Sequence, residues 1–419
     1  MVAACAVAAA LVAVPAVTAH AADAGSNWWY KSFGVAEAQS QGWTGAGVKV
    51  AVIDNQINPD LPVFEGARLK VDDRALCKGG TVRVADSDQS DAASHGSDVT
   101  ALLIGNGEGK GQVRGIAPRA EVTFYGEGIG SGVCDSGGDF DGRDPLIEGI
   151  HRAVASGAQI ISISLGWGDY ATPADDEAIA EALAAGVVIV AATPNSVKDA
   201  EQLWPWSFNG VVAVNAMDQS GRIQQDQRVS GKQIGWKDTT VVAPGVGFAS
   251  VDWRSGTWVI SGASLATPLT AGILAVTAQK YPKATGGQLI QSLIRNTGLK
   301  DHELSRNGGW GYGVVSLRHM LRVDPMTYAD ANPLMDKSKA RPTAGQVTAA
   351  EVAASAAPAA TATSSPTRVI PSDAASSTAA GLPMGWIIGA VVLALIAAAA
   401  IVIVIVMNRK KSKSVGGAK

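Results

Sequence analysis

The sequence predicts an α/β fold with a mostly parallel central sheet, joined to one C-terminal transmembrane helix. Short apolar runs rich in β-branched residues recur along the middle of the chain, and stretches with helical spacing alternate with them. Such alternation is typical of an open parallel sheet that helices cover on both faces. A long uncharged apolar segment then stands near the C-terminus, which predicts the transmembrane helix.

The predicted strands are short and almost entirely apolar, as expected for strands buried on both faces of a sheet. The first, 48–53, ends directly before Asp54. The others are 121–125, 159–163, 187–192, 211–214 and 240–243.

The predicted helices follow from apolar spacing and from their end signals. The stretches 144–156 and 175–185 are followed by Gly157 and Gly186, each placed as a C-terminal cap. Ligands of open parallel sheets bind beyond the carboxyl ends of the strands. Residues that fall just past such ends are therefore candidate site residues, and they are Asp54, the stretch from Ser164 to Trp167, and Asn195.

Composition excludes some classes of partner. The net charge is −3 and the sequence has no basic stripe, so no nucleic-acid partner is expected. Apolar residues make up 47% of the chain, which is enough for one large core. The three cysteines form no CxxC pair, and no metal site is predicted.

Both ends of the chain carry signals for the membrane. Residues 1–21 are mostly apolar and close with Ala19-His20-Ala21, a cleavage pattern that predicts a signal peptide although no Lys or Arg precedes Lys31. An ordinary apolar helix is the alternative.

The segment from Gly385 to Met407 has 23 residues without a charge, enough to span about 30 Å of hydrocarbon. A core helix of a soluble domain is the alternative there. The bases that follow the segment predict a cytoplasmic tail and an extracellular domain, and they are Arg409, Lys410, Lys411, Lys413 and Lys419.

Three segments carry the residue types of nucleophilic catalysis. Segment 261–268 (SGASLATP) leads into a long apolar helical stretch, so Ser264 is expected near a helix N-terminus, where negative charge is favoured. A serine needs a base, and the base needs an orienting acid. His95 begins an apolar helix, and Asp54 ends the first strand. Singly, each residue is more simply read as a helix cap, a structural histidine or a turn residue.

Along the chain the three residues come in the order Asp, His, Ser, and their segments resemble those of subtilases: an acid after the first strand, H-G-[ST]-x-V and G-x-S-x-A-x-P. The resemblance covers about residues 45–320 and implies a subtilisin-like three-layer fold. It implies a serine endopeptidase with Asp54, His95 and Ser264 as its triad and Asn195 in the oxyanion hole. It also implies that Ser164, Leu165 and Gly166 pair with the substrate backbone.

The sequence departs from the family pattern around these residues. Asn55-Gln56 follows the acid where the family usually has [ST]-G, Ala263 replaces a threonine, and Pro194 replaces a glycine. Trp167 either narrows the cleft or packs on the surface. The departures keep open a catalytically weak or silent structural subunit as the alternative function.

The layout resembles that of mycosins, the membrane-anchored subtilases of type VII secretion systems. That resemblance implies secretion-complex subunits as partners, beside the polypeptide substrate and the lipid bilayer. It also implies a disulfide between Cys77 and Cys134, which composition alone leaves open against two buried thiols. No cofactor is expected; the acidic stretch 139–144 either binds calcium or is a solvated loop.

The predicted organisation therefore has six parts. They are a signal peptide (1–21), an N-terminal extension (22–45), a subtilase catalytic domain (46–325), an Ala/Ser/Pro-rich linker (326–383), a transmembrane helix (384–407) and a basic cytoplasmic tail (408–419).

Overall fold

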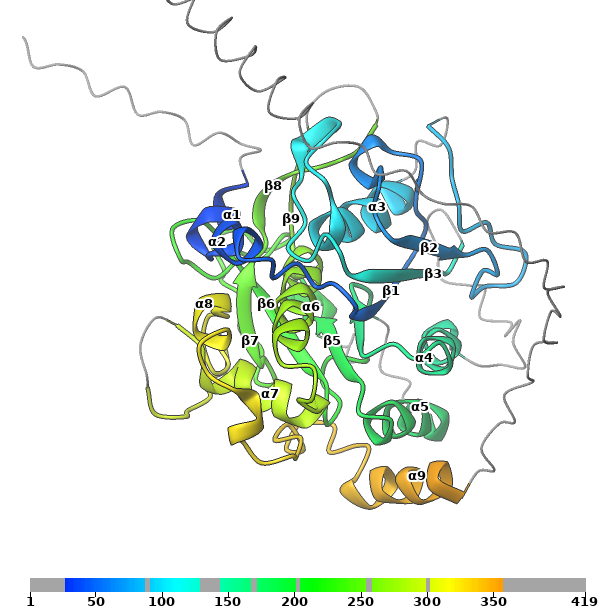
Figure 1. Ribbon diagram of the computed structural model, residues 1–419, viewed down its shortest axis with the longest axis vertical. Helices are drawn as coiled ribbons and strands as arrows, with labels where there is room; N and C mark the ends of the chain where they lie inside the picture. The colour runs from blue at the N-terminus through cyan, green and yellow to red at the C-terminus, as the bar shows by residue number, and fades with distance from the viewer. Residues whose placement is uncertain are drawn as a thin grey trace, which may run out of the picture. The chain divides into compact units, whose positions relative to one another are not determined.

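The computed structural model describes residues 27–86, 91–128, 144–166, 172–200, 204–253, 258–298 and 302–356. Within these residues a seven-stranded, all-parallel sheet runs in the order β2-β3-β1-β4-β5-β6-β7 (Figure 1). Its strands are β1 (Lys49–Asp54), β2 (Leu69–Asp72), β3 (Glu121–Gly126), β4 (Ile160–Ile163), β5 (Val188–Ala192), β6 (Val212–Met217) and β7 (Val241–Pro244). The predicted parallel sheet is confirmed, and each predicted strand lies within about one to three residues of an observed one.

Helices cover both faces of this sheet. Because side chains alternate along a strand, β1 sends Val50 and Val52 to one core and Ala51 and Ile53 to the other. The first core is closed by α3 (Asp91–Ile104), α6 (Ala263–Lys280) and α7 (Gly286–Arg295), and the second by α4 (Pro145–Ala155) and α5 (Pro173–Ala184).

Smaller elements complete the described part of the chain. The N-terminal helices α1 (Trp28–Ser32) and α2 (Val35–Ser40) pack on the first core through Trp29, Val35 and Ala38. An antiparallel pair, β8 (Val246–Ala249) and β9 (Val259–Ser261), leads directly into α6, and α8 (Leu317–Met320) follows α7.

The strand order places the site. From β1 the chain moves to β2 and β3 on one side of the sheet and then crosses to β4 and β5 on the other. The order therefore reverses between β1 and β4, and a crevice forms at such a switch point beyond the carboxyl ends. Asp54 ends β1, and Ser164 directly follows β4.

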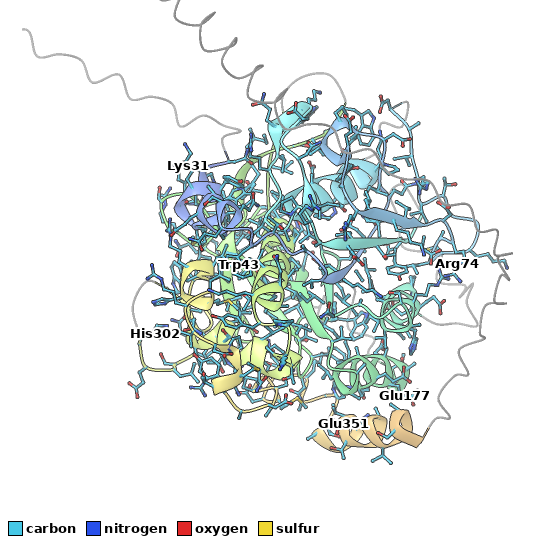
Figure 2. All side chains as sticks on the ribbon, in the orientation of Figure 1. Lys31, Trp43, Arg74, Glu177, His302 and Glu351 are labelled. Atoms are coloured by element: carbon cyan, nitrogen blue, oxygen red, sulfur yellow. The ribbon has the colours of Figure 1, made fainter. Side chains whose placement is uncertain are left out.

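The structure corrects the start of the predicted Ala/Ser/Pro-rich linker at residue 326, because residues 326–356 are folded. Leu334 is fully buried, Lys337 Nζ donates to Thr240 Oγ1 at 3.0 Å, and Arg341 Nε donates to Asp176 Oδ1 at 2.6 Å. Helix α9 (Ala344–Ala356) then packs against α5; Glu351 and Glu177 mark the two helices in Figure 2. The prediction failed because Lys337 and Arg341 find their partners far away along the chain, and because alanine, which offers little apolar surface, has the strongest helix propensity.

Within the described residues, no helix is both long and apolar enough to cross a bilayer. The predicted signal peptide and the predicted membrane helix at 384–407 lie outside those residues, as does the rest of the predicted linker beyond 356.

Candidate active site

Asp54 stands at the end of the central strand β1 with no exposed surface. Its Oδ1 accepts a hydrogen bond of 2.8 Å from the Asn55 amide. The neighbouring departure from the family pattern leaves this carboxylate in place, because the buried Gln56 side chain turns away and donates to the Thr81 carbonyl at 2.7 Å.

His95 reaches this carboxylate from α3. Its Nδ1 lies 2.8 Å from Asp54 Oδ1. The next residue, Gly96, explains the approach of the helix: a Cβ there would lie 2.0 Å from the Gln56 carbonyl oxygen. Only glycine allows the backbone of α3 to approach the loop after β1 this closely, and this approach brings the imidazole to the acid.

Two carboxylates act electrostatically on His95. Burial alone would lower the pKa of His95, but the charge and hydrogen bond of Asp54, together with the charge of Asp98, raise it above its ordinary value. Asp98 is itself buried, and burial raises its pKa to about 7. Its Oδ1 accepts from the Val251 amide at 2.7 Å and its Oδ2 from Ser250 Oγ at 2.8 Å.

Ser264 is the second residue of α6, which agrees with the predicted position near a helix N-terminus. Pro268 lies inside this helix and has no N–H to donate to the Ser264 carbonyl four residues earlier. Ser164 Oγ donates to that carbonyl at 2.7 Å instead. The Ser164 side chain therefore stabilises the turn that carries the nucleophile candidate.

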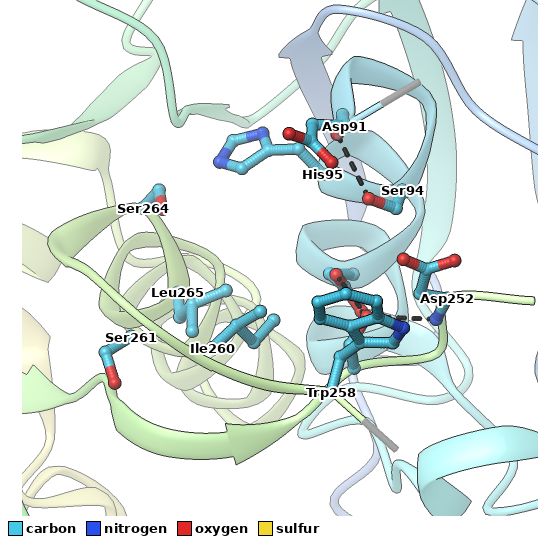
Figure 3. A pocket seen from close by; sticks show the side chains of 11 residues that line it. Asp91, Ser94, His95, Asp252, Trp258, Ile260, Ser261, Ser264 and Leu265 are labelled. Atoms are coloured by element: carbon cyan, nitrogen blue, oxygen red, sulfur yellow. Dashed lines mark hydrogen bonds between the residues drawn. The ribbon is translucent and has the colours of Figure 1, made fainter. Parts of the chain in front are cut away.

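His95 and Ser264 line one cleft of about 360 Å³. In Figure 3 the imidazole extends from α3 toward the start of α6, where Ser264 lies. The hydrogen bonds of the described residues include none between these two side chains; apo catalytic contacts often tighten only with substrate. Acidic and apolar side chains complete the wall, and they include Asp91, Asp98, Asp252, Trp258, Ile260 and Leu265.

The Asn195 side chain is held with its carbonyl turned away from the serine. Its Oδ1 accepts from the Ala263 amide at 2.8 Å and from Gln224 Nε2 at 3.1 Å. A Cβ built on Gly262 would lie 3.0 Å from Asn195 Nδ2 and 3.2 Å from Ser264 Oγ, so the amide donor and the hydroxyl flank the same point. The unusual Pro194 before it is fixed by Trp236 Nε1, which donates to its carbonyl at 3.0 Å.

The remaining predicted residues are placed only in part. Leu165 and Gly166 follow β4 and are half-buried, and Trp167 lies outside the described residues. Cys77 is buried, and its amide donates to the Glu127 carbonyl at 3.0 Å; Cys134 lies outside the described residues. Of the acidic stretch 139–144 only Asp144 is described, and it caps α4 through the Leu146 amide at 2.8 Å.

The geometry thus brings an acid, a base and a serine together in the order Asp, His, Ser on a parallel sheet. The family model for the subtilase family (Peptidase_S8) matches residues 45–311. The chain belongs to the subtilase family.

This subtilase is similar to curated relatives that are longer than the region it matches. It is 28% identical over 311 residues to Fervidolysin of Fervidobacterium pennivorans, an alignment that covers 69% of this chain and 43% of that protein. It is 31% identical over 281 residues to Alkaline elastase YaB of Bacillus sp. (strain YaB), covering 67% of this chain and 66% of the relative.

Solved structures support the same fold. The crystal structure of fervidolysin, a keratinolytic enzyme related to subtilisin, matches with a TM-score of 0.56 at 24% identity, over 72% of this subtilase and 47% of that chain. MycP1 from Mycobacterium smegmatis matches with a TM-score of 0.52 at 20% identity, over 74% and 88% of the two chains. The predicted subtilisin-like fold is confirmed.

Sequence reasoning missed two site residues. Asp98 stands three positions after His95 on the same helix, a spacing that places both on one face and could have identified it. Gln224 lies 29 positions from Asn195 and meets it only in the folded chain, so no sequence signal identified it.

Proposed function

We propose that this subtilase is a serine endopeptidase that cleaves polypeptides through Asp54, His95 and Ser264, with an acyl-enzyme intermediate. The hydrogen bond of 2.8 Å between His95 Nδ1 and the buried Asp54 carboxylate carries this proposal, because it leaves Nε2 of the neutral ring free to act as a base in the cleft that Ser264 lines.

The proposed reaction follows from these positions. His95 takes the Ser264 proton as Oγ attacks the scissile carbonyl, and Asp54 stabilises the imidazolium that forms. The resulting oxyanion is stabilised by Asn195 Nδ2 and by the backbone amide of Ser264 at the positive end of α6. His95 then returns the proton to the leaving amine, and water hydrolyses the ester by the same route.

Fluorophosphonate labelling tests the proposal without knowledge of the substrate. The full-length chain is expected to be labelled at Ser264, because the probe reacts only with a serine activated by its base. Mass spectrometry of the labelled peptide identifies the site. The Ser264→Ala variant should remain unlabelled, and the Ser261→Ala variant, which removes a cleft hydroxyl three residues earlier, should be labelled. An unlabelled wild-type chain would favour the structural-subunit alternative.

We further propose that the domain is secreted and tethered to the cell membrane by residues 384–407, with 408–419 in the cytoplasm. The uncharged segment and the bases after it support this orientation. Protease added to intact cells is expected to remove the domain and to leave a small protected C-terminal fragment. A tag after Lys419 that is cleaved before permeabilisation would contradict the orientation.

The predicted order of signal peptide, catalytic domain, linker, membrane helix and basic tail also supports a role in processing exported proteins in a type VII-like secretion system.

The proposed disulfide between Cys77 and Cys134 would close a loop of about 57 residues in an oxidising compartment. By loop-closure entropy it would stabilise the fold by about 4 kcal/mol, less any strain. Peptide mapping of the unreduced, exported chain is expected to recover the two cysteines in one linked peptide pair. Two thiols that alkylate without reduction would contradict it.

A further inference from the structure

The loop after β6 contacts the Asn195 amide through a buried glutamine. Gln224 is only 4% exposed, and its backbone is held on both sides: its amide donates to the Ala216 carbonyl at 2.9 Å, and its carbonyl accepts from the Ile234 amide at 3.1 Å. Its Nε2 lies 3.1 Å from Asn195 Oδ1 and 3.1 Å from Asn215 Oδ1. One side-chain amide thus joins two asparagine carbonyls.

The direction of this chain of amides is set at both ends by backbone groups. Asn215 Nδ2 donates to the Ile234 carbonyl at 3.0 Å, and a carbonyl can only accept. The Asn215 oxygen must then face Gln224, which must present its NH₂ group. At the other end the Ala263 backbone amide, which can only donate, donates to Asn195 Oδ1 at 2.8 Å.

The result is that only Asn195 Nδ2 can face the serine. An asparagine amide turned by 180° would instead present an acceptor to a developing negative charge, and stabilisation would become repulsion. Two donors on Oδ1 oppose that rotation. We propose that Gln224 is a positioning residue that orients the Asn195 amide toward the oxyanion, an inference that rests on the proposed endopeptidase function.

We call the hydrogen-bonded side-chain amides of Asn215, Gln224 and Asn195 the amide relay. Neighbouring residues hold the backbone on which this relay depends. The Gln227 amide donates to the Asn195 carbonyl at 3.1 Å, and Gln227 Nε2 donates to the Ser261 carbonyl at 2.8 Å. Asp226 accepts from Ser196 Oγ at 2.9 Å and from the Val197 amide at 2.6 Å. Burial opposes the ionised form of Asp226, but hydrogen bonds from backbone amides and Ser196 outweigh it and lower the pKa of Asp226 to about 2. This anchor is therefore ionised at neutral pH.

Gln224→Met in the full-length chain tests the relay, because methionine has a similar length and no donor. We expect kcat on an unfolded protein substrate and the fluorophosphonate labelling rate to fall by about 10- to 100-fold, less than the 10²–10³ expected for loss of the asparagine itself. KM should stay within about twofold, since the oxyanion forms only after binding. Gln225→Met is the matched control, because Gln225 is the exposed neighbour, and it should behave as wild type.

Two further variants separate positioning from simple packing. On an Asn195→Ala background, Gln224→Met should add less than about a twofold loss, because residues that act through one another are not additive. Gln224→Glu keeps the shape of the side chain, but its two carboxylate oxygens are acceptors that would face the acceptor oxygens of Asn195 and Asn215. This variant should lose at least as much activity as Gln224→Met. Full additivity, or a Gln224→Glu enzyme as active as wild type, would overturn the proposal.

The relay and the activity fail in distinguishable ways. If the wild-type chain reacts and Gln224→Met reacts equally fast, the relay is wrong and the protease assignment stands. If the wild-type chain does not react, the relay is tested by NMR of the Asn195 side-chain NH₂ group. Its resonances are assigned in ¹⁵N-Asn-labelled protein as those that disappear in Asn195→Ala. They should shift in Gln224→Met but not in Gln225→Met, and unchanged resonances in Gln224→Met would overturn the relay.

Discussion

Replacing His95 with alanine is expected to lower kcat by about 10⁶-fold, the loss known for the corresponding residue of subtilisin, a member of the same family. His95 is the histidine that lines the cleft together with Ser264, and Asp54 fixes its ring through Nδ1. Without it the serine hydroxyl keeps its proton and is a weak nucleophile. Hydrolysis of an unfolded protein substrate by the full-length chain measures the effect.

The chain offers a matched control for this variant. His151 on α4 has a side chain that is 33% exposed, against 31% for His95, and its Nδ1 also meets a carboxylate, Glu181, at 2.9 Å. His151→Ala removes a similar ring from the other face of the sheet and should retain wild-type kcat. A His95→Ala enzyme within about tenfold of wild type would mean that another base serves Ser264.

Asp54→Asn should lower kcat by about 10⁴-fold while the fold is retained. The amide has the shape of the carboxylate but carries no charge, so it cannot stabilise the imidazolium that forms when His95 takes the Ser264 proton. Asp60→Asn is the control, because Asp60 is exposed in the loop after the same strand, and it should leave kcat unchanged.

The pH profile of the residual activity gives a second readout. The pKa of His95 is raised, so wild-type kcat/KM should fall as the pH drops through a value above about 6.5. Removing the Asp54 charge removes a major cause of that increase, so the acidic limb of Asp54→Asn should move to lower pH. An acidic limb that stays in place would mean that Asp54 does not act on the group that titrates.

Much of the fold follows from local pattern. Strand β1 and the helix that carries Ser264 were predicted because burial on both faces requires continuous apolar runs, and because a small-residue turn precedes a long apolar helix. The triad candidates followed from their places at the ends of these elements. The exact ends were less predictable: Asp54 is the last residue of β1, and Pro268 lies inside α6 beyond its first turn.

Other features depend on contacts between distant segments. The folded course of residues 326–356 depends on Lys337 reaching Thr240 and Arg341 reaching Asp176, which an alanine-rich composition does not reveal. Ser164 was expected near the substrate, and the structure adds that its hydroxyl satisfies the Ser264 carbonyl that Pro268 leaves without its helical donor. Both cases turn on a polar group whose partner lies about a hundred or more residues away.

By itself the sequence determined the parallel α/β architecture and the three residues that meet at the carboxyl ends of its strands. Periodicity and strand ends are local properties, and they are therefore readable along the chain. The tertiary structure alone decided how the Asn195 amide is turned. An amide can point either way in isolation, and its direction is set by donors that Gln224 and Ala263 bring from remote parts of the chain.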